Sequence, residues 1–124
     1  MLRCLIVDDS AQFLAAARRW LEGQGIFVVG VASTLTEALH QTAELHPDVV
    51  LVDIDLGGQS GLEVTKQLLE RSDGDPFHVI LISAHAEEDY AELIAASPAV
   101  GFLPKMTLSG QRIRELVDLA GQHT

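Results

Sequence analysis

Charged or hydroxyl side chains directly follow four short apolar runs of this chain. In chain order they are Asp8 with Asp9, Asp53, Ser83 and Lys105. Three carboxylates held close together repel one another, so such a cluster usually serves a hard cation such as Mg²⁺. Mg²⁺ keeps coordination positions open for a phosphate oxygen, and a nearby ammonium and hydroxyl can bind the other oxygens. The set therefore predicts phosphoryl transfer to one of the aspartates, as an aspartyl-phosphate.

The apolar runs themselves are expected to be strands of a parallel sheet. They are residues 5–7, 49–52, 79–82 and 100–104. Short runs rich in β-branched residues are typical of strands that are buried on both faces. Because an open α/β sheet binds its ligands at the carboxyl ends of its strands, we expect the polar groups to meet at that edge.

Amphipathic segments alternate with apolar ones along the whole chain, and this alternation predicts an α/β fold with five strand–helix units. The expected strands are 2–7, 26–32, 48–53, 77–83 and 99–103, with helices between them, one of them at 87–96, and a turn at 73–76. Short connections favour right-handed crossovers and a doubly wound sheet with helices on both faces. No glycine-rich phosphate loop follows the first strand, which favours the flavodoxin-like order 2-1-3-4-5 over the dinucleotide-binding type. Trp20, in the first helix, is expected to pack in the core.

Composition limits the classes of function. A chain of 124 residues with 48% hydrophobic residues is expected to form one domain, over 1–124. Its formal charge of −10 argues against direct binding to nucleic acid or to an anionic membrane. The single cysteine, Cys4, cannot form a disulfide within the chain, and no apolar run has membrane-spanning length. We therefore expect a cytoplasmic protein.

The residue types suggest how the cluster divides its work. Asp9 and Asp53 are the candidates for direct contact with the metal ion, and Asp8 for contact through water. The loop around Asp55 could offer a backbone carbonyl. Lys105 and the Ser83 hydroxyl would supply positive charge and a hydrogen bond to the phosphoryl oxygens.

The whole pattern resembles the receiver domain of two-component response regulators, over about residues 2–120. Four pieces carry the resemblance: Asp8-Asp9, the segment 52–62, Ser83-Ala84, and Gly101-Phe102 with Lys105 three residues beyond the phenylalanine. Each piece alone is a weak signal, whereas all four in order on the expected strand ends are specific. The segment 101–109 is most similar to receivers that are joined to LuxR-type DNA-binding domains.

The resemblance implies roles for the acidic residues. Asp53 would be the phosphoacceptor, and Asp8 and Asp9 would organise Mg²⁺. Asp55 would give its backbone carbonyl to the metal. The donor would be a sensor histidine kinase or a phosphotransfer protein, and the domain would catalyse its own phosphorylation and dephosphorylation. The output would be transcription, through a DNA-binding domain that is not in this chain, and phosphorylation could also drive formation of a homodimer.

The resemblance further implies a switch and a control of lifetime. Ser83 and Lys105 would contact the phosphoryl oxygens, and Phe102 would rotate into the space that the Ser83 hydroxyl vacates. This would remodel the surface of the fourth helix, the fifth strand and the fifth helix. Asp55 lies two residues beyond Asp53, and His85 lies two residues beyond Ser83. Both side chains would border the path of an attacking water and tune self-dephosphorylation.

Two other interpretations stay open. The segment 53–57 resembles the Asp-x-Asp opening of haloacid-dehalogenase-type phosphatases, which also form an aspartyl-phosphate with Mg²⁺. Those enzymes place this motif after their first strand, whereas here it follows the third. A receiver that has lost phosphorylation and acts only as a binding module is the second alternative, which the intact acidic set disfavours.

Overall fold

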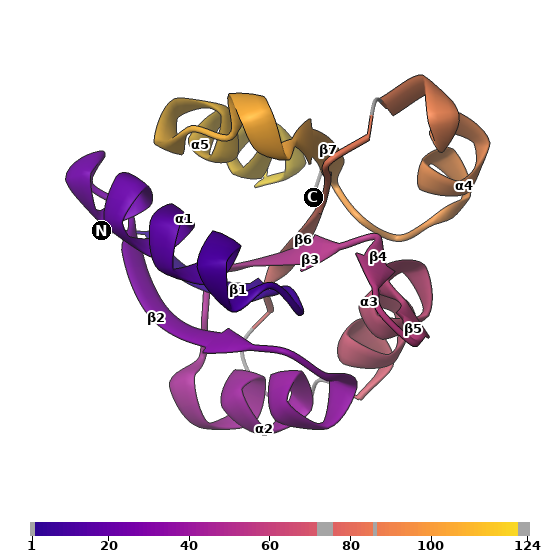
Figure 1. Cartoon of the computed structure of the whole chain (residues 1–124), viewed down its shortest axis with the longest axis horizontal. Coiled ribbons are helices and arrows are strands. Elements are labelled where there is room, and N and C mark those ends of the chain that lie inside the picture. Colours follow the sequence, from indigo (N-terminus) through magenta and orange to yellow (C-terminus); the bar gives the residue numbers. More distant parts are fainter. Residues whose placement is uncertain (1, 72–75, 86, 122–124) are drawn as a thin grey trace.

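A five-stranded parallel sheet forms the centre of the molecule (Figure 1). The computed structural model describes residues 2–71, 76–85 and 87–121. The strands are β1 (Arg3–Val7), β2 (Phe27–Ala32), β3 (Val49–Asp53), β6 (His78–Ser83) and β7 (Gly101–Pro104). Their spatial order is β2-β1-β3-β6-β7, and every neighbouring pair is parallel. The predicted flavodoxin-like order is therefore confirmed, with β3 between β1 and β6.

Helices cover both faces of this sheet (Figure 1). They are α1 (Ala11–Gly23), α2 (Leu35–Leu45), α3 (Gly61–Glu70), α4 (Ala91–Ala96) and α5 (Gly110–Gly121). Leu21 of α1 and Ile113 of α5 belong to the apolar cluster on one face. Ala38 of α2 and Leu68 of α3 belong to the cluster on the other. Two separate cores therefore hold the sheet, whose central strands are buried on both sides.

Local side-chain chemistry sets where the first two helices begin. The Ser10 hydroxyl accepts a hydrogen bond from the backbone N–H of Phe13 at 3.2 Å and caps α1. Thr34 caps α2 in the same way through the N–H of Glu37, also at 3.2 Å. Such caps satisfy N–H groups that have no partner within the helix. The first cap fixes the direction in which the chain leaves the acidic end of β1.

The segment expected to form one helix at 87–96 differs from the prediction. It divides into a single 3₁₀ turn, η1 (Glu87–Asp89), and the six-residue α4, in which no residue is buried. Tyr90 and Ile94 only partly pack against the core. Because half of the α4 residues are alanines and its Leu93 is 54% exposed, this segment gains little from burial.

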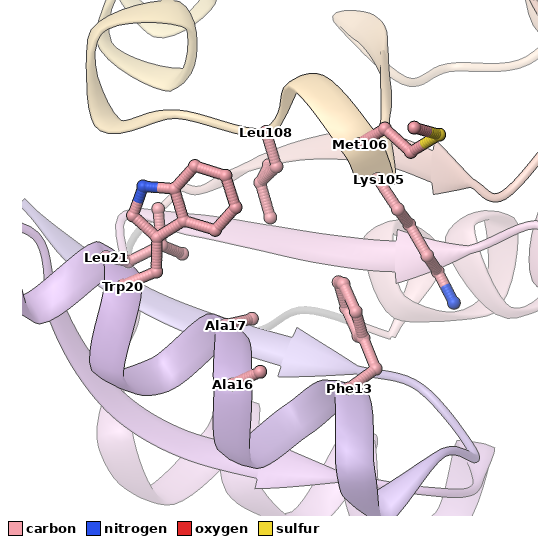
Figure 2. A pocket seen from close by; sticks show the side chains of 8 residues that line it. All are labelled: Phe13, Ala16, Ala17, Trp20, Leu21, Lys105, Met106 and Leu108. Carbon is pink, nitrogen blue, oxygen red and sulfur yellow. The ribbon is translucent and has the colours of Figure 1, made fainter.

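Trp20 corrects a second prediction, since its side chain is not in the core. It is 50% exposed, whereas Leu21 beside it is fully buried. Leu21 lies on the buried stripe of α1, and Trp20 lies on the flank of that stripe. There it lines an apolar cavity of about 270 Å³ between α1 and the segment 105–108, opposite Leu108 (Figure 2).

Two further expectations concern the turn before β6 and the absence of a membrane-spanning segment. The turn predicted at 73–76 falls largely outside the described residues. Among the helices that are described, none is long and apolar enough to cross a membrane.

Candidate functional site

The ends of β1 and β3 bring three carboxylates together. Asp8 and Asp9 directly follow β1, and Asp53 is the last residue of β3. The register that pairs Val7 with Val52 places these strand ends side by side. One oxygen of each carboxylate lies within 4.8 Å of the other two. Asp8 and Asp53 are buried, while Asp9 is exposed and faces solvent at the rim of the cluster.

The ammonium of Lys105 lies between the two buried carboxylates. Lys105 directly follows β7 and begins the 3₁₀ turn η2 (Lys105–Thr107). Its Nζ is 2.6 Å from Asp8 Oδ2 and 3.0 Å from Asp53 Oδ2. It also lies 4.4 Å from the centre of the Phe13 ring, close enough for a cation–π contact. Figure 2 shows the aliphatic stem of Lys105 beside the cavity and its ammonium pointing away from Trp20.

The charges in this cluster shift the pKa values of its members. Burial raises the pKa of Asp53, and the charge of Asp8 adds to this effect. Hydrogen bonds from Lys105 and from the backbone N–H of Asp55 oppose it in part. Burial by itself lowers the pKa of Lys105, but its close contacts with the Asp8 and Asp53 carboxylates outweigh burial and raise that pKa. Lys105 is therefore a stable cation, while Asp53 carries a charge that its surroundings only partly compensate.

The donor set of the cluster fits a hard divalent cation. Three carboxylates from Asp8, Asp9 and Asp53 converge, and Lys105 offsets only part of their negative charge. Oxygen ligands of this kind are those that Mg²⁺ prefers. The residues present therefore fit the metal that the sequence predicts.

A small hairpin borders the cluster where the sequence predicts only a loop. It consists of β4 (Asp55–Leu56) and β5 (Gln59–Ser60), which pair antiparallel. The backbone N–H of Asp55 donates to Asp53 Oδ1 at 3.0 Å. At the hairpin turn, Gly57 has φ +59°, and a Cβ there would lie 2.9 Å from the Asp9 carboxylate. Glycine is thus the residue that suits this turn.

Gly61, at the start of α3, allows the closest backbone approach to the acceptor strand. Its N–H donates to the carbonyl of Ile54 at 2.7 Å. A Cβ at this position would overlap the backbone carbonyl of Asp53. The sequence motif contains this glycine, but its steric role is visible only in the structure.

The remaining residues that the sequence selects lie on β6, β7 and the segment after β6. Ser83 is buried at the end of β6, and its Oγ accepts a hydrogen bond from the His85 N–H at 3.0 Å. Phe102 is buried in β7, paired with Leu81 of β6. His85 is exposed. The sheet edge thus holds Ser83 beside the carboxylates, with Phe102 one strand further away.

Tyr90 is a contact of the site that sequence reasoning missed. Its hydroxyl donates to Asp55 Oδ2 at 2.9 Å, and its ring centre is 6.3 Å from that of His85. The hydrogen bond to Asp55 is the largest of the causes that raise the pKa of Tyr90. The two residues are 35 positions apart, and no motif links them, so only the fold reveals this pair.

The chain belongs to the response regulator receiver domain family, whose model matches residues 4–118. It is 36% identical over 106 residues to the response regulator GacA of Pseudomonas viridiflava, covering 85% of this chain and 49% of that protein. It is 38% identical over 117 residues to a protein-glutamate methylesterase/protein-glutamine glutaminase of Myxococcus xanthus, covering 93% of this chain and 33% of that protein. The recognised family is therefore confirmed.

A solved structure supports the same assignment. A two-component response regulator of the LuxR family from Aurantimonas sp. superposes with a TM-score of 0.81 at 25% identity, covering 94% of this chain and 84% of that one. The chain spans only about a third to a half of the two curated relatives named above. Their remaining parts, and the activities that their names state, belong to those proteins.

Proposed function

We propose that this receiver domain accepts a phosphoryl group on Asp53 from a sensor histidine kinase or a phosphotransfer protein. The observation that carries the proposal is the place of Asp53, which is buried at a strand end beside the Lys105 ammonium and close to two further carboxylates. A carboxylate oxygen of Asp53 would attack phosphorus, and the bond between phosphorus and the donor's imidazole nitrogen would break. Lys105 would then bind a phosphoryl oxygen and Ser83 would hydrogen-bond another.

The metal would be held by Asp8, Asp9 and Asp53, together with the backbone carbonyl of Asp55. When bound, Mg²⁺ would neutralise charge on the phosphoryl oxygens. The buried Asp8 carboxylate accepts a hydrogen bond from the Ser10 N–H at 2.8 Å, which fixes its orientation toward the cluster. Asp9, which is exposed, would be the most accessible ligand.

The output would follow from a change of surface on the β6–β7 side. Ser83 would move toward the phosphoryl group, and Phe102 would rotate into the space that it leaves. We propose that the single domain over 1–124 acts in a longer regulator of transcription, and that phosphorylation could favour a homodimer. On this view the domain is a signalling module that modifies itself, without turnover of an external substrate.

Labelling by a small phosphoryl donor tests the acceptor. With acetyl phosphate and Mg²⁺ we expect up to one phosphoryl group per wild-type chain and none in Asp53→Asn, measured by intact-protein mass spectrometry. Asp118→Asn, which changes an exposed carboxylate of α5, is the matched control and should be labelled normally. Labelling that persists in Asp53→Asn would overturn the assignment of the acceptor. An unlabelled wild-type chain would favour the binding-module interpretation, and sustained phosphate release from a phosphomonoester would favour the phosphatase.

Thermal unfolding tests the metal independently of phosphorylation. Millimolar Mg²⁺ should raise the melting temperature of the wild type, because a ligand that binds only the folded state stabilises it. The shift should be smaller in Asp9→Ala. An equal shift in both proteins, or none in the wild type, would contradict the proposed site.

A further inference from the structure

Tyr90 links the start of α4 to the β4–β5 hairpin, which borders the acceptor Asp53. It directly precedes α4, and its hydroxyl donates to Asp55 Oδ2 at 2.9 Å. The backbone N–H of Asp55 in turn donates to Asp53 Oδ1 at 3.0 Å. A short chain of hydrogen bonds therefore leads from the phenol of Tyr90 to the acceptor carboxylate.

This chain of contacts fixes the orientation of the Asp55 side chain. Asp55 is exposed, so its carboxylate would otherwise rotate freely in water. The phenol occupies one of its two oxygens and holds it toward α4. The Tyr90 ring also lies 6.3 Å from the His85 ring, so the phenol side chain borders both residues that flank the expected water path.

We infer that Tyr90 is a positioning residue that lengthens the life of the phosphoryl group by occupying a carboxylate oxygen of Asp55 that would otherwise bind the attacking water. This inference rests on the proposed function. In hydrolysis, the water oxygen bonds to phosphorus and the bond between phosphorus and the Asp53 oxygen breaks. Inorganic phosphate and the free Asp53 carboxylate result, and the proton of the water passes to solvent. A released Asp55 carboxylate can accept a hydrogen bond from that water and orient it, which favours attack.

The test is a double-mutant cycle on phosphoryl lifetime. Tyr90→Phe keeps the ring and removes only the hydroxyl, and Asp55→Ala removes the carboxylate that the hydroxyl holds. Each variant is labelled with acetyl phosphate, freed of donor, and followed by phosphate release. We expect Tyr90→Phe to shorten the half-life about threefold to tenfold, as the loss of one ordinary hydrogen bond would. In the Asp55→Ala background the same substitution should have no effect.

Controls separate positioning from a general loosening of α4. Leu93→Ala changes a side chain of α4 that is 54% exposed, and its phosphoryl lifetime should equal that of the wild type. If Tyr90→Phe shortens the lifetime equally with and without the Asp55 carboxylate, its role is structural and the inference is wrong.

The outcome also distinguishes this inference from the proposed function. Wild-type chains that are labelled on Asp53, with an unchanged lifetime in Tyr90→Phe, would overturn only the role of Tyr90. Wild-type chains that cannot be labelled would overturn both.

Discussion

The two sides of the acceptor site are built in different ways. On the side of β1 and β3, Asp8 and Asp53 are buried and share the ammonium of Lys105. On the side of α4, a six-residue helix without a buried residue meets the site through the Tyr90 hydroxyl. We call these the acceptor side and the α4 side.

The difference separates chemistry from response. Buried charges in a close-packed setting hold their geometry, which a phosphoryl acceptor needs. An element with little buried apolar surface can change its position at low free-energy cost, which a switch needs. Breaking either side should therefore have unequal effects on the free energy of unfolding and on phosphoryl lifetime.

The largest contrast should come from truncating the same residue type on the two sides. Ile82 of β6 is fully buried and supports the acceptor side through its register pairing with Asp53, whereas Ile94 of α4 only partly packs against the core. We expect Ile82→Ala to lower the free energy of unfolding by about 4 kcal/mol. Ile94→Ala should lower it by about 1 kcal/mol. Urea denaturation measures both, and equal losses would remove the proposed difference between the sides.

A methyl group at Gly61 should damage the acceptor side through the backbone. Its Cβ would overlap the Asp53 carbonyl, so we expect Gly61→Ala to cost about 3 kcal/mol in the free energy of unfolding. Gly58→Ala is the matched control, because nothing lies within 4 Å of a Cβ there. Urea melts of the two variants provide the measurement, and a stable Gly61→Ala protein would show that α3 can shift without harm.

Removal of the shared cation tests the electrostatics of the acceptor side. Lys105→Met leaves two buried carboxylates without their ammonium, and we expect it to cost about 2 kcal/mol, since Lys105 is itself partly exposed. Mg²⁺ should restore more stability in this variant than in the wild type, because the metal replaces the lost charge. Thermal melts with and without Mg²⁺ measure this, and equal gains would argue against a shared role for the two cations.

The smallest predicted effect is a gain in stability. Burial raises the pKa of Asp53 in the folded state, so ionised Asp53 reduces stability. Without metal, Asp53→Asn should therefore stabilise the protein slightly at neutral pH. Below the ordinary carboxyl pKa, Asp53 is protonated in both the folded and the unfolded protein, so the stability gained by Asp53→Asn should vanish there. As pH rises from that value through the raised pKa of the folded state, the ionisation of Asp53 lowers the stability of the wild type. Urea melts at several pH values test this, and a gain that is independent of pH would exclude the ionisation of Asp53 as its cause.

The sheet and the meeting of its polar strand ends could be predicted from sequence, because both follow from strand order. Once β1, β3 and β6 are neighbours, Asp8, Asp53 and Ser83 must lie at one edge. Helix burial was less predictable, since Trp20 satisfies the helical spacing and yet lies beside the buried stripe. Hydropathy alone does not say how wide that stripe is.

The contacts that α4 and the hairpin make with the site could not be predicted. The Tyr90–Asp55 hydrogen bond depends on where a weakly packed helix lies against the hairpin, which no local pattern encodes. The steric demand at Gly61 depends on the path of the Asp53 backbone, and the hairpin 55–60 is too short to leave a periodic signal. The cluster of carboxylates with Lys105 can be inferred from residue types and strand order. The contacts of Tyr90 and Gly61 near that cluster depend on tertiary geometry.

Lys105 also has a consequence for the way the chain matures during synthesis. It pairs with Asp53 from 52 residues further along the chain and offsets part of its negative charge. A nascent chain that ends before Lys105 has no such ammonium for Asp8 and Asp53, so any sheet formed at that stage would hold these carboxylates without their shared counter-charge. Asp53 therefore gains its positive partner only once β7 has joined the sheet. A translation product that is truncated before Lys105 would carry Asp53 without this ammonium.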